Sequence, residues 1–255
     1  VAFRAVALGV AVHTVPPAHA WEVMGVNSKA QLAELERIWQ HEQAHQLLVN
    51  GVTLADPARL DVRGKMICGR DVEIDVGCIF EGEVYLANGT RIGAYSIIKN
   101  SRIGTNTYIE PYSHIDQVEI GDNCRIGPYA RLRPGSKLHN EVHIGNFVEV
   151  KNSEIATSSK ANHLSYIGDS NVGSRVNIGA GTITCNYDGV NKFQTTIEDG
   201  VFVGFNSALV APVTLANDST IGAGSVITKN TPADQLTVSR ARQVSISEWQ
   251  RPRKK

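Results

Sequence analysis

Aliphatic residues recur at every sixth position over most of this 255-residue chain. The spacing starts near residue 74 and continues to residue 227, with occasional slips to five residues and one insertion. Gly often follows the aliphatic residue, and a small or β-branched residue often stands two positions before it. One unbroken run is Ile120, Ile126, Leu132, Leu138, Ile144 and Val150.

A fixed period of six predicts a hexapeptide-repeat parallel β-helix. One hexapeptide is a short strand plus a turn, and three of them form a triangular coil of about 18 residues. The aliphatic side chain points inward, Gly permits a tight corner, and each coil pairs with the next about 4.8 Å away. We therefore expect an all-β chain with a β-helix domain at 51–232 and a C-terminal tail at 233–255.

The period also makes a geometric prediction, because residues 18 apart in an unbroken run share one column. Arg133 follows Leu132 and Lys151 follows Val150, so the two cations should lie one coil apart on one face. Stacked like charges repel unless an anion lies between them. The pair therefore indicates a phosphate site, although long side chains that splay into water are the alternative.

A second column contains a candidate base. Asn146, His163 and Ala180 each stand two residues after an inward position. His163 is flanked by small or polar residues, and it lies near the two cations and an Asn- and Tyr-containing insertion at 185–194. A loop that leaves a rigid scaffold is a common place for binding groups.

The segment before the repeat contains a motif that suggests a metalloprotease. Asn27 and Ser28 followed by Gln31 indicate a helix start with a capping box, and a linker α-helix should occupy 28–50. HEQAH at 41–45 fits H-E-x-x-H. Leu32, Leu35, Trp39 and Leu47 should form the packing face. The two histidines then point away from this face, so a solvent-exposed helix is the simpler interpretation.

Composition excludes some classes of function. The 25 basic and 25 acidic residues balance, which argues against bulk electrostatic binding of nucleic acid or membrane. Cys68, Cys78, Cys124 and Cys185 fit no disulfide framework, so a reducing compartment is expected. The apolar run at 5–12 is interpreted as a buried strand before a Pro-containing turn, with a secretory signal as the alternative. No stretch approaches a membrane span of about 20 apolar residues.

Several motifs resemble one known family. GPYARLRPG, HIGNFVEVKNS, KANHLSYIGD, VNIGAGTITCNYDGVNKF and LVAPV are similar to the acetyltransferase half of the bacterial bifunctional N-acetylglucosamine-1-phosphate uridyltransferase/glucosamine-1-phosphate acetyltransferase. The resemblance implies a left-handed β-helix, a homotrimer with active sites between subunits, and a cytoplasmic location. It implies acetyl transfer from acetyl-CoA to glucosamine 1-phosphate for UDP-N-acetylglucosamine synthesis, a precursor of peptidoglycan and lipopolysaccharide.

The resemblance also assigns roles to residues. His163 matches the general base, and its side chain can accept a proton near neutral pH. The positions that match substrate-binding residues are Arg133, Lys151, Tyr166, Asn177, Asn186 and Lys192. The positions that match coenzyme A contacts are Ala180, Tyr187, Phe205, Ala223 and Arg240, and Phe205 stands where the family commonly has a small hydroxyl residue.

The uridyltransferase half of the family pattern is mostly absent. Residues 1–27 resemble the end of that domain, and Asn27 matches one of its magnesium positions. No Gly-rich nucleotide loop and no acidic metal ligand accompany it. We therefore expect this chain to acetylate but not to transfer uridylyl groups, whereas a full-length parent would do both and would use Mg²⁺.

Three other functions remain possible from the residues. The first is another hexapeptide acyltransferase with a different acceptor, against which the CNYDGVNKF insertion argues. The second is a zinc-dependent β-helix hydratase of the carbonic anhydrase type, and the third is a non-catalytic trimeric scaffold. The hydratase needs three converging histidines, and the candidates occupy different column offsets: His114, His139, His143 and His163.

Overall fold

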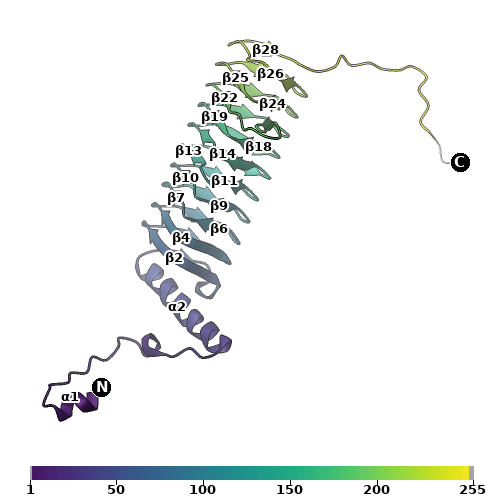
Figure 1. Ribbon diagram of the computed structural model, residues 1–255. Helices are drawn as coiled ribbons and strands as arrows, with labels where there is room; N and C mark the ends of the chain where they lie inside the picture. Colours follow the sequence, from purple (N-terminus) through teal and green to yellow (C-terminus); the bar gives the residue numbers. More distant parts are fainter. Residues whose placement is uncertain (1, 253–255) are drawn as a thin grey trace.

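The computed structural model describes residues 2–252 and shows a three-sided parallel β-solenoid of about ten turns. The coils stack into a long prism, with a helix across the end nearest the N-terminus (Figure 1). The hexapeptide repeat and this architecture fit the left-handed β-helix that the family resemblance implied. The strands run from β1 to β28, so the last strand lies beyond residue 232, the expected end of the β-helix domain.

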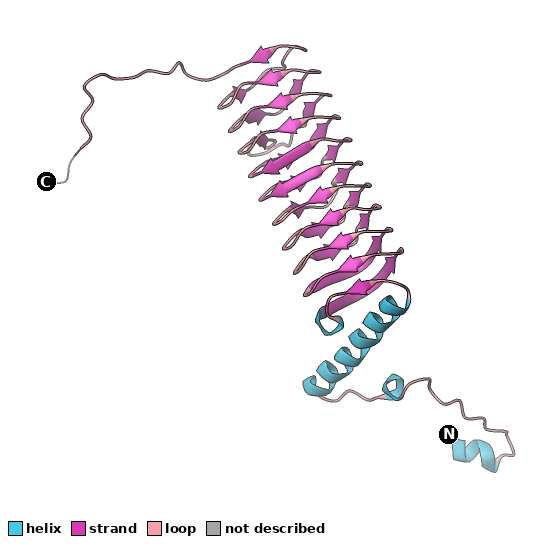
Figure 2. Cartoon of the chain, turned by 180° about the vertical axis from the view of Figure 1, so that it is seen from behind, coloured by secondary structure: helices cyan, strands magenta, loops and turns pink. Residues whose placement is uncertain are grey.

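The first face of the prism is one parallel sheet of 11 strands, stacked along the prism axis (Figure 2). Most of its strands have only two residues, but β14 and β17 have four. Its strands are β1 (Thr53–Leu54), β3 (Glu73–Ile74), β5 (Arg91–Ile92), β8 (Tyr108–Ile109), β11 (Arg125–Ile126), β14 (His143–Asn146), β17 (Lys160–His163), β20 (Asn177–Ile178), β23 (Phe202–Val203), β26 (Thr220–Ile221) and β28 (Leu236–Thr237).

The second and third faces share two long strands that continue around a corner, β2 (Leu60–Cys68) and β4 (Cys78–Leu86). The second face continues with β6 (Ile97–Lys99), β9 (His114–Asp116), β12 (Arg131–Leu132), β15 (Glu149–Lys151), β18 (Tyr166–Gly168), β21 (Ile183–Cys185), β24 (Ala208–Val210) and β27 (Val226–Ile227). The third face continues with β7 (Arg102–Ile103), β10 (Glu119–Ile120), β13 (Lys137–Leu138), β16 (Glu154–Ile155), β19 (Ser170–Val172), β22 (Thr195–Ile197) and β25 (Val213–Leu215).

The core consists of inward-pointing residues in columns along the prism axis. Every aliphatic repeat position of the unbroken run is buried. The residues two positions earlier are buried too, and they are small or hydroxylated where the corners tighten, as at Thr107, Ser113 and Ser159. These hydroxyls satisfy backbone carbonyls: Thr107 Oγ1 donates to the Gly121 carbonyl at 2.8 Å. Buried aliphatic side chains and buried hydroxyl groups with hydrogen-bond partners therefore both line the interior of the coils.

The linker helix α2 (Lys29–Val49) begins as predicted. Ser28 Oγ accepts from the Gln31 backbone N–H at 3.2 Å, and Gln31 Oε1 accepts from the Asn27 N–H at 2.8 Å. These two bonds complete the capping box.

The predicted packing face of this helix is largely wrong. Leu32 and Trp39 are 48% and 41% exposed, whereas the buried residues are Gln40 and Ala44. Only the C-terminal part of α2, around Leu47, packs on the prism core. The apolar residues nearer the start of the helix lie beyond the end of the prism (Figure 1).

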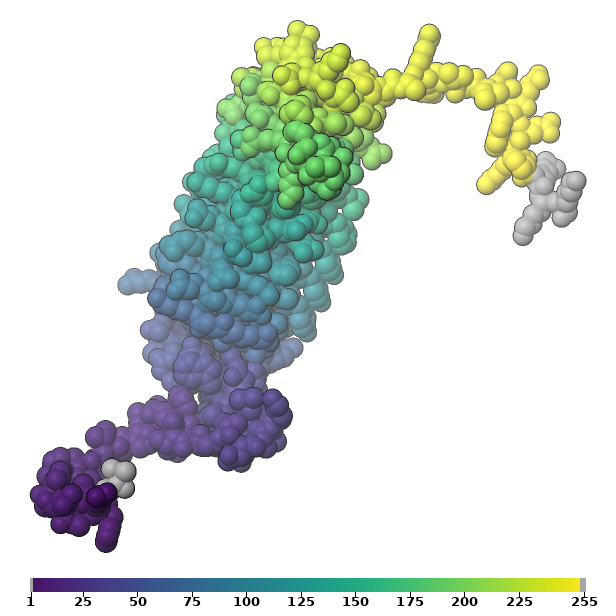
Figure 3. Space-filling model, viewed as in Figure 1, coloured from purple at the N-terminus to yellow at the C-terminus, as the bar shows by residue number. Residues whose placement is uncertain are grey.

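The N-terminal segment differs from its prediction. Only residues 5–7 of the apolar run are helical, at the end of the short helix α1 (Ala2–Ala7), and no residue of the run is buried, so the expected buried strand is wrong. A 3-10 turn, η1 (Ala20–Val23), follows, and another, η2 (Pro57–Arg59), leads into β2. Both terminal segments extend away from the prism (Figure 3). Within residues 2–252, no helix combines the length and apolar character needed to cross a membrane.

Candidate active site

The candidate base lies at the edge of the first face, where the chain turns toward the second. Asn146 on β14 is directly paired with His163 on β17. Because Ala161 pairs with Ile178 in the next coil, Ala180 lies on the other side of His163. The spacing had predicted this column of three residues, and the register confirms it.

The same column continues past the insertion. Ile178 pairs with Val203, and Val203 pairs with Ile221. Phe205 and Ala223 therefore follow Ala180 toward the C-terminal end. Arg240 reaches this column as well, since its guanidinium donates to the Ala223 carbonyl at 2.7 Å. Four of the five residues matched to coenzyme contacts thus lie along one line that starts at His163.

His163 has a defined side-chain contact. Its Nδ1 lies 2.8 Å from Asn146 Oδ1. An amide oxygen only accepts, so Nδ1 carries the hydrogen of this bond. The opposite nitrogen, Nε2, then has its lone pair free on an exposed imidazole.

The two predicted phosphate cations interrupt an ordered column of charges on the second face. Leu132 pairs with Val150, so Arg133 and Lys151 are adjacent, as the 18-residue spacing predicted. Closer to the helix, the same column alternates in sign from coil to coil: Arg63, Glu81, Lys99, Asp116 and Arg133. The repetition of positive charge at Lys151 is therefore a local departure from charge pairing.

Each of these cations has a carboxylate partner. Arg133 Nη1 lies 2.7 Å from Glu149 Oε1, and Lys151 Nζ lies 3.6 Å from Asp169 Oδ2. The repeat did not reveal either carboxylate. Neither carboxylate is a direct register neighbour of its cation, because Gly168 is opposite Lys151 and Arg131 is opposite Glu149.

Asp169 is the centre of a small polar cluster. Its Oδ1 accepts from Asn152 Nδ2 at 2.6 Å, and its Oδ2 accepts from Asn186 Nδ2. The Asp169 side chain is only 13% exposed. Burial opposes its ionisation, but the two amides and the nearby Lys151 and Lys192 outweigh burial and lower the pKa of Asp169. Asp169 is thus an anion that contacts two candidate substrate-binding residues, Lys151 and Asn186.

Tyr166 begins the second face in the coil that carries His163. A Cβ placed on Gly168 would lie 2.3 Å from the Tyr166 hydroxyl oxygen. The phenol therefore extends along its own strand toward the Lys151 column, because Lys151 pairs with Gly168. Asn177 lies farther from this group, at the opposite end of the first face, where it pairs with Lys160.

The insertion between β21 and β22 brings the remaining predicted residues. An antiparallel bridge joins Tyr187 to Lys192, and Asp188 Oδ1 accepts from the Val190 and Asn191 N–H groups at 2.8 and 2.7 Å. Asn186 at its base is buried and Tyr187 is exposed. The insertion stands out as a green bulge on the prism surface (Figure 3).

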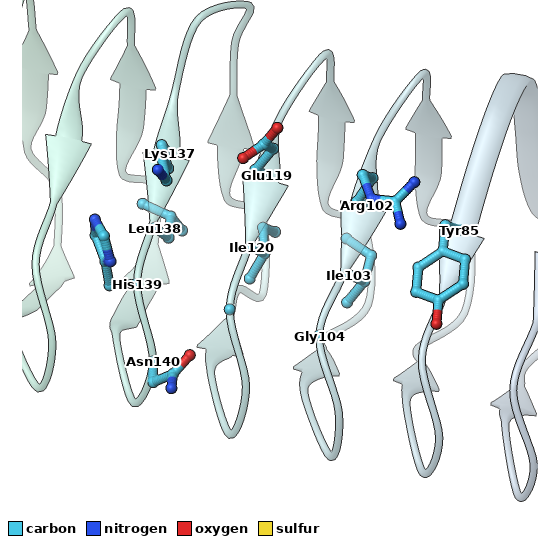
Figure 4. A pocket seen from close by; sticks show the side chains of 11 residues that line it. Tyr85, Arg102, Ile103, Gly104, Glu119, Ile120, Lys137, Leu138, His139 and Asn140 are labelled. Atoms are coloured by element: carbon cyan, nitrogen blue, oxygen red, sulfur yellow. The ribbon is translucent and has the colours of Figure 1, made fainter.

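The hollow drawn in Figure 4 lies elsewhere, on the third face. Its lining includes Arg102, Glu119, Lys137 and His139, and none of the residues expected in the acetyltransferase site. Arg102, Glu119 and Lys137 are register neighbours of alternating sign, and His139 is paired with Glu154 at 2.6 Å. On this surface, positive and negative side chains alternate from coil to coil, and charges of one sign do not cluster.

The candidate metal-binding residues form no metal site in the part of the chain that the structure describes. Among residues 2–252, no group of three or more His, Cys, Asp or Glu side chains could hold a metal ion. His41 and His45 are exposed on α2, and Asn27 uses its backbone N–H in the capping box. The described residues therefore do not fit a magnesium site at Asn27 or a zinc site at HEQAH. All four cysteines are free thiols.

Comparison with known proteins points to one group of enzymes. The pattern of the bacterial transferase hexapeptide (six repeats) matches residues 100–134, 117–152 and 194–229. The bifunctional protein GlmU of Herminiimonas arsenicoxydans is 64% identical over 248 residues, which is 97% of this chain and 55% of that protein. GlmU of Cupriavidus pinatubonensis is 61% identical over 252 residues, 99% of this chain and 56% of that protein.

The chain thus spans about half the length of the curated relatives it matches. A solved UDP-N-acetylglucosamine acyltransferase from Arabidopsis has the same fold, with a TM-score of 0.57 and 17% identity. The alignment covers 71% of this chain and 70% of that one.

Proposed function

This chain carries hexapeptide repeats of the bacterial transferase type and is the counterpart of the C-terminal part of the bifunctional GlmU proteins, and on that premise we propose that it is a glucosamine-1-phosphate N-acetyltransferase. The proposed acyl donor is acetyl-CoA. The observation that carries the proposal is the order of the candidate residues around one corner of the prism: Lys151 is adjacent to Arg133 and pairs with Gly168, which follows His163 by five residues.

The proposed phosphate site consists of Arg133 and Lys151, with Lys192 from the insertion. Guanidinium and ammonium groups are suited to phosphate oxygens. Lys151 lies two residues along the second face from the position of Tyr166 in the neighbouring strand. Two residues of strand span roughly 7 Å, a distance that one sugar phosphate can bridge. Tyr166 and Asn186 would bind the sugar between the phosphate and His163.

The proposed chemistry is a direct acyl transfer. The unprotonated amine attacks the thioester carbonyl carbon and forms the new C–N bond. His163 Nε2 accepts the proton that the nitrogen loses. The C–S bond breaks, and the sulfur leaves as a thiolate that takes this proton from the imidazolium to become the coenzyme thiol. The products are N-acetylglucosamine 1-phosphate and coenzyme A.

The donor is proposed to lie along the column of Ala180, Phe205 and Ala223, with Tyr187 and Arg240 beside it. Small side chains next to His163 leave room for the thioester, and Arg240 provides a cation for a phosphate of the coenzyme. Phe205 is exposed and offers an apolar surface rather than a hydroxyl. Asn177 is proposed as a further contact to the acceptor.

A homotrimer in the cytoplasm is part of this proposal. On one chain the candidate site is an open corner of the prism, and a neighbouring subunit would enclose it. Four free thiols agree with a reducing compartment. Uridylyl transfer with Mg²⁺ is proposed only for longer relatives that carry the other half of the sequence.

The test of the base is release of free thiol from acetyl-CoA in the presence of glucosamine 1-phosphate. His163→Ala should lower kcat by about 10²- to 10⁴-fold, the usual contribution of general base catalysis. His139→Ala, on the third face, is the matched control and should retain wild-type activity. Wild-type turnover by His163→Ala would show that His163 is not the base.

The phosphate site is tested separately. Arg133→Ala should raise the KM for glucosamine 1-phosphate about tenfold or more, with little change in the KM for acetyl-CoA, because one charge-assisted contact to the phosphate is lost. Arg131→Ala, which removes a cation from the same strand, is the control. Equal effects on both KM values would contradict the assignment.

A different acceptor is the main alternative within the hexapeptide acyltransferases. It is tested by running the thiol-release assay with glucosamine, glucosamine 6-phosphate and UDP-glucosamine. The proposal requires a kcat/KM for glucosamine 1-phosphate well above those of the other acceptors.

A further inference from the structure

The pairing of Asn146 with His163 depends on a local extension of the first face. β14 and β17 each have four residues, whereas the flanking β11 and β20 have two. This extension continues the sheet to the Asn146–His163 pair. Gly145 permits the close approach of the strands, because a Cβ there would lie 1.9 Å from the Asn162 carbonyl oxygen.

The hydrogen bond selects one tautomer of the imidazole. Oδ1 of Asn146 can only accept, so the neutral ring is held with hydrogen on Nδ1 and the lone pair on Nε2. If Nδ1 lacked its hydrogen, two acceptors would face each other at 2.8 Å. The bond also fixes the rotation of a side chain that is otherwise exposed.

The other strands around His163 offer few side chains that could hydrogen-bond the imidazole and select its tautomer. β14 contributes His143, whose pKa is lowered, mainly by burial and then by Arg125. β17 itself contributes Lys160, and β20 contributes Asn177 and Ile178, neither of which titrates. Tyr166 follows beyond the corner. Within residues 2–252, the only side chain that hydrogen-bonds the imidazole is therefore a neutral amide.

We propose that Asn146 is a positioning residue that keeps His163 in the Nδ1–H tautomer with Nε2 directed toward the acceptor amine. This inference rests on the proposed acetyl transfer. The proton moves from the amine to Nε2, while the Nδ1 hydrogen stays in place. The amide therefore favours the competent tautomer without adding a charge that would raise the pKa of the base.

The kinetic test compares Asn146→Ala with the control Asn171→Ala, an exposed asparagine on β19 of the third face. Asn146→Ala should lower kcat about 10- to 100-fold, as loss of a partner that orients a catalytic group commonly does. Both KM values should change less than about twofold, since substrate contacts remain. Unchanged kcat in Asn146→Ala would overturn the inference.

A charged replacement gives a readout that a purely structural role would not alter. In Asn146→Asp the carboxylate accepts from Nδ1–H and favours the imidazolium, so the pKa of His163 rises. The acidic limb of the pH profile of kcat/KM should then move to higher pH by about one unit. A limb that stays in place, in a folded Asn146→Asp protein, would contradict the contact.

A spectroscopic measurement separates this inference from the proposed function. The ¹⁵N signals of His163, assigned by their absence from His163→Ala, should report hydrogen on Nδ1 in the wild type and a tautomer mixture in Asn146→Ala. A hydrogen on Nε2 in the wild type would overturn the inference whatever the activity. Active His163→Ala protein would instead refute the proposed base, while inactive His163→Ala with fully active Asn146→Ala would refute only the role of Asn146.

Discussion

At the scale of single residues, both predicted phosphate cations of the site already pair with carboxylates of the chain. Arg133 pairs with Glu149 and Lys151 with Asp169, so a bound phosphate would compete with carboxylates for both cations. Lys192 adds a third positive charge close enough to lower the pKa of Asp169. Three cations against two carboxylates leave a net positive charge, which suits an anionic substrate.

Asp169 should make stability depend on pH in a defined way. Its pKa in the folded chain is below the ordinary Asp value of 3.8. It therefore stabilises the fold above its unfolded pKa, and this contribution is lost as pH falls through the lower, folded pKa. Asp169→Asn should lower Tm at pH 7 by roughly 2 to 6 °C.

The difference in Tm between wild type and Asp169→Asn should shrink as the pH is lowered below about 4. Thermal melts between pH 3 and pH 7 measure it. Asp116→Asn, on the same face but outside the Asp169 cluster, is the control. A difference that stays constant over this range would show that the Asp169 charge does not stabilise the fold.

Column positions were predictable from the sequence, and side-chain partners were not. The 18-residue spacing correctly placed Arg133 beside Lys151, and the shared offset of two residues from an inward position placed His163 between Asn146 and Ala180. The Asp169 cluster escaped prediction because Asn186 reaches it from the insertion, whose path no repeat specifies. The bond from Arg133 to Glu149 escaped because it crosses from one column to the next.

At the scale of elements, α2 covers the end of the solenoid, where the first coil has no neighbouring coil on one side. β2 would expose the unpaired backbone groups of an edge strand. Gln40 covers them: its Oε1 accepts from the Val62 N–H at 2.7 Å and its Nε2 donates to the Val62 carbonyl at 2.9 Å. The side-chain amide thus takes the place of a peptide group from a further coil.

The helix was predictable from its capping box, but its packing face was not. Counting apolar residues at about 100° per residue selected Leu32 and Trp39, which are exposed. The end of a parallel β-helix presents backbone donors and acceptors as well as apolar surface, so a buried amide fits it. A criterion that counts only apolar residues could not select Gln40, because its side chain is polar.

Gln40→Ala should destabilise the chain by about 3 kcal/mol, because it leaves the buried N–H and carbonyl of Val62 without partners. The exposed edge should also promote association between chains. Gln46→Ala is the matched control, since Gln46 bonds only Glu42 on the same helix at 2.8 Å. Chemical denaturation and light scattering measure both effects, and equal stability of the two variants would exclude the capping role.

At the scale of the whole molecule, each coil contacts only the coils before and after it. Tyr85 pairs with Arg102, which in turn pairs with Glu119. The stability of such a molecule is approximately a sum over coils and their interfaces. The candidate site begins at Arg133 and lies beyond these coils, so coils nearer the helix act as a spacer.

Removal of two whole coils, residues 85–118, should therefore leave a folded protein with an intact site. Residue 84 would join Glu119, which takes the register position of Tyr85, and Glu81 would meet Arg133, a favourable pair.

Removal of residues 85–109 instead ends within a coil and brings Pro111 to the buried position of Leu86. This second deletion should not fold, because inward and outward positions no longer coincide. Circular dichroism melts and the thiol-release assay distinguish the two. If both deletions fold equally well, or neither does, the register between coils is not what specifies this fold.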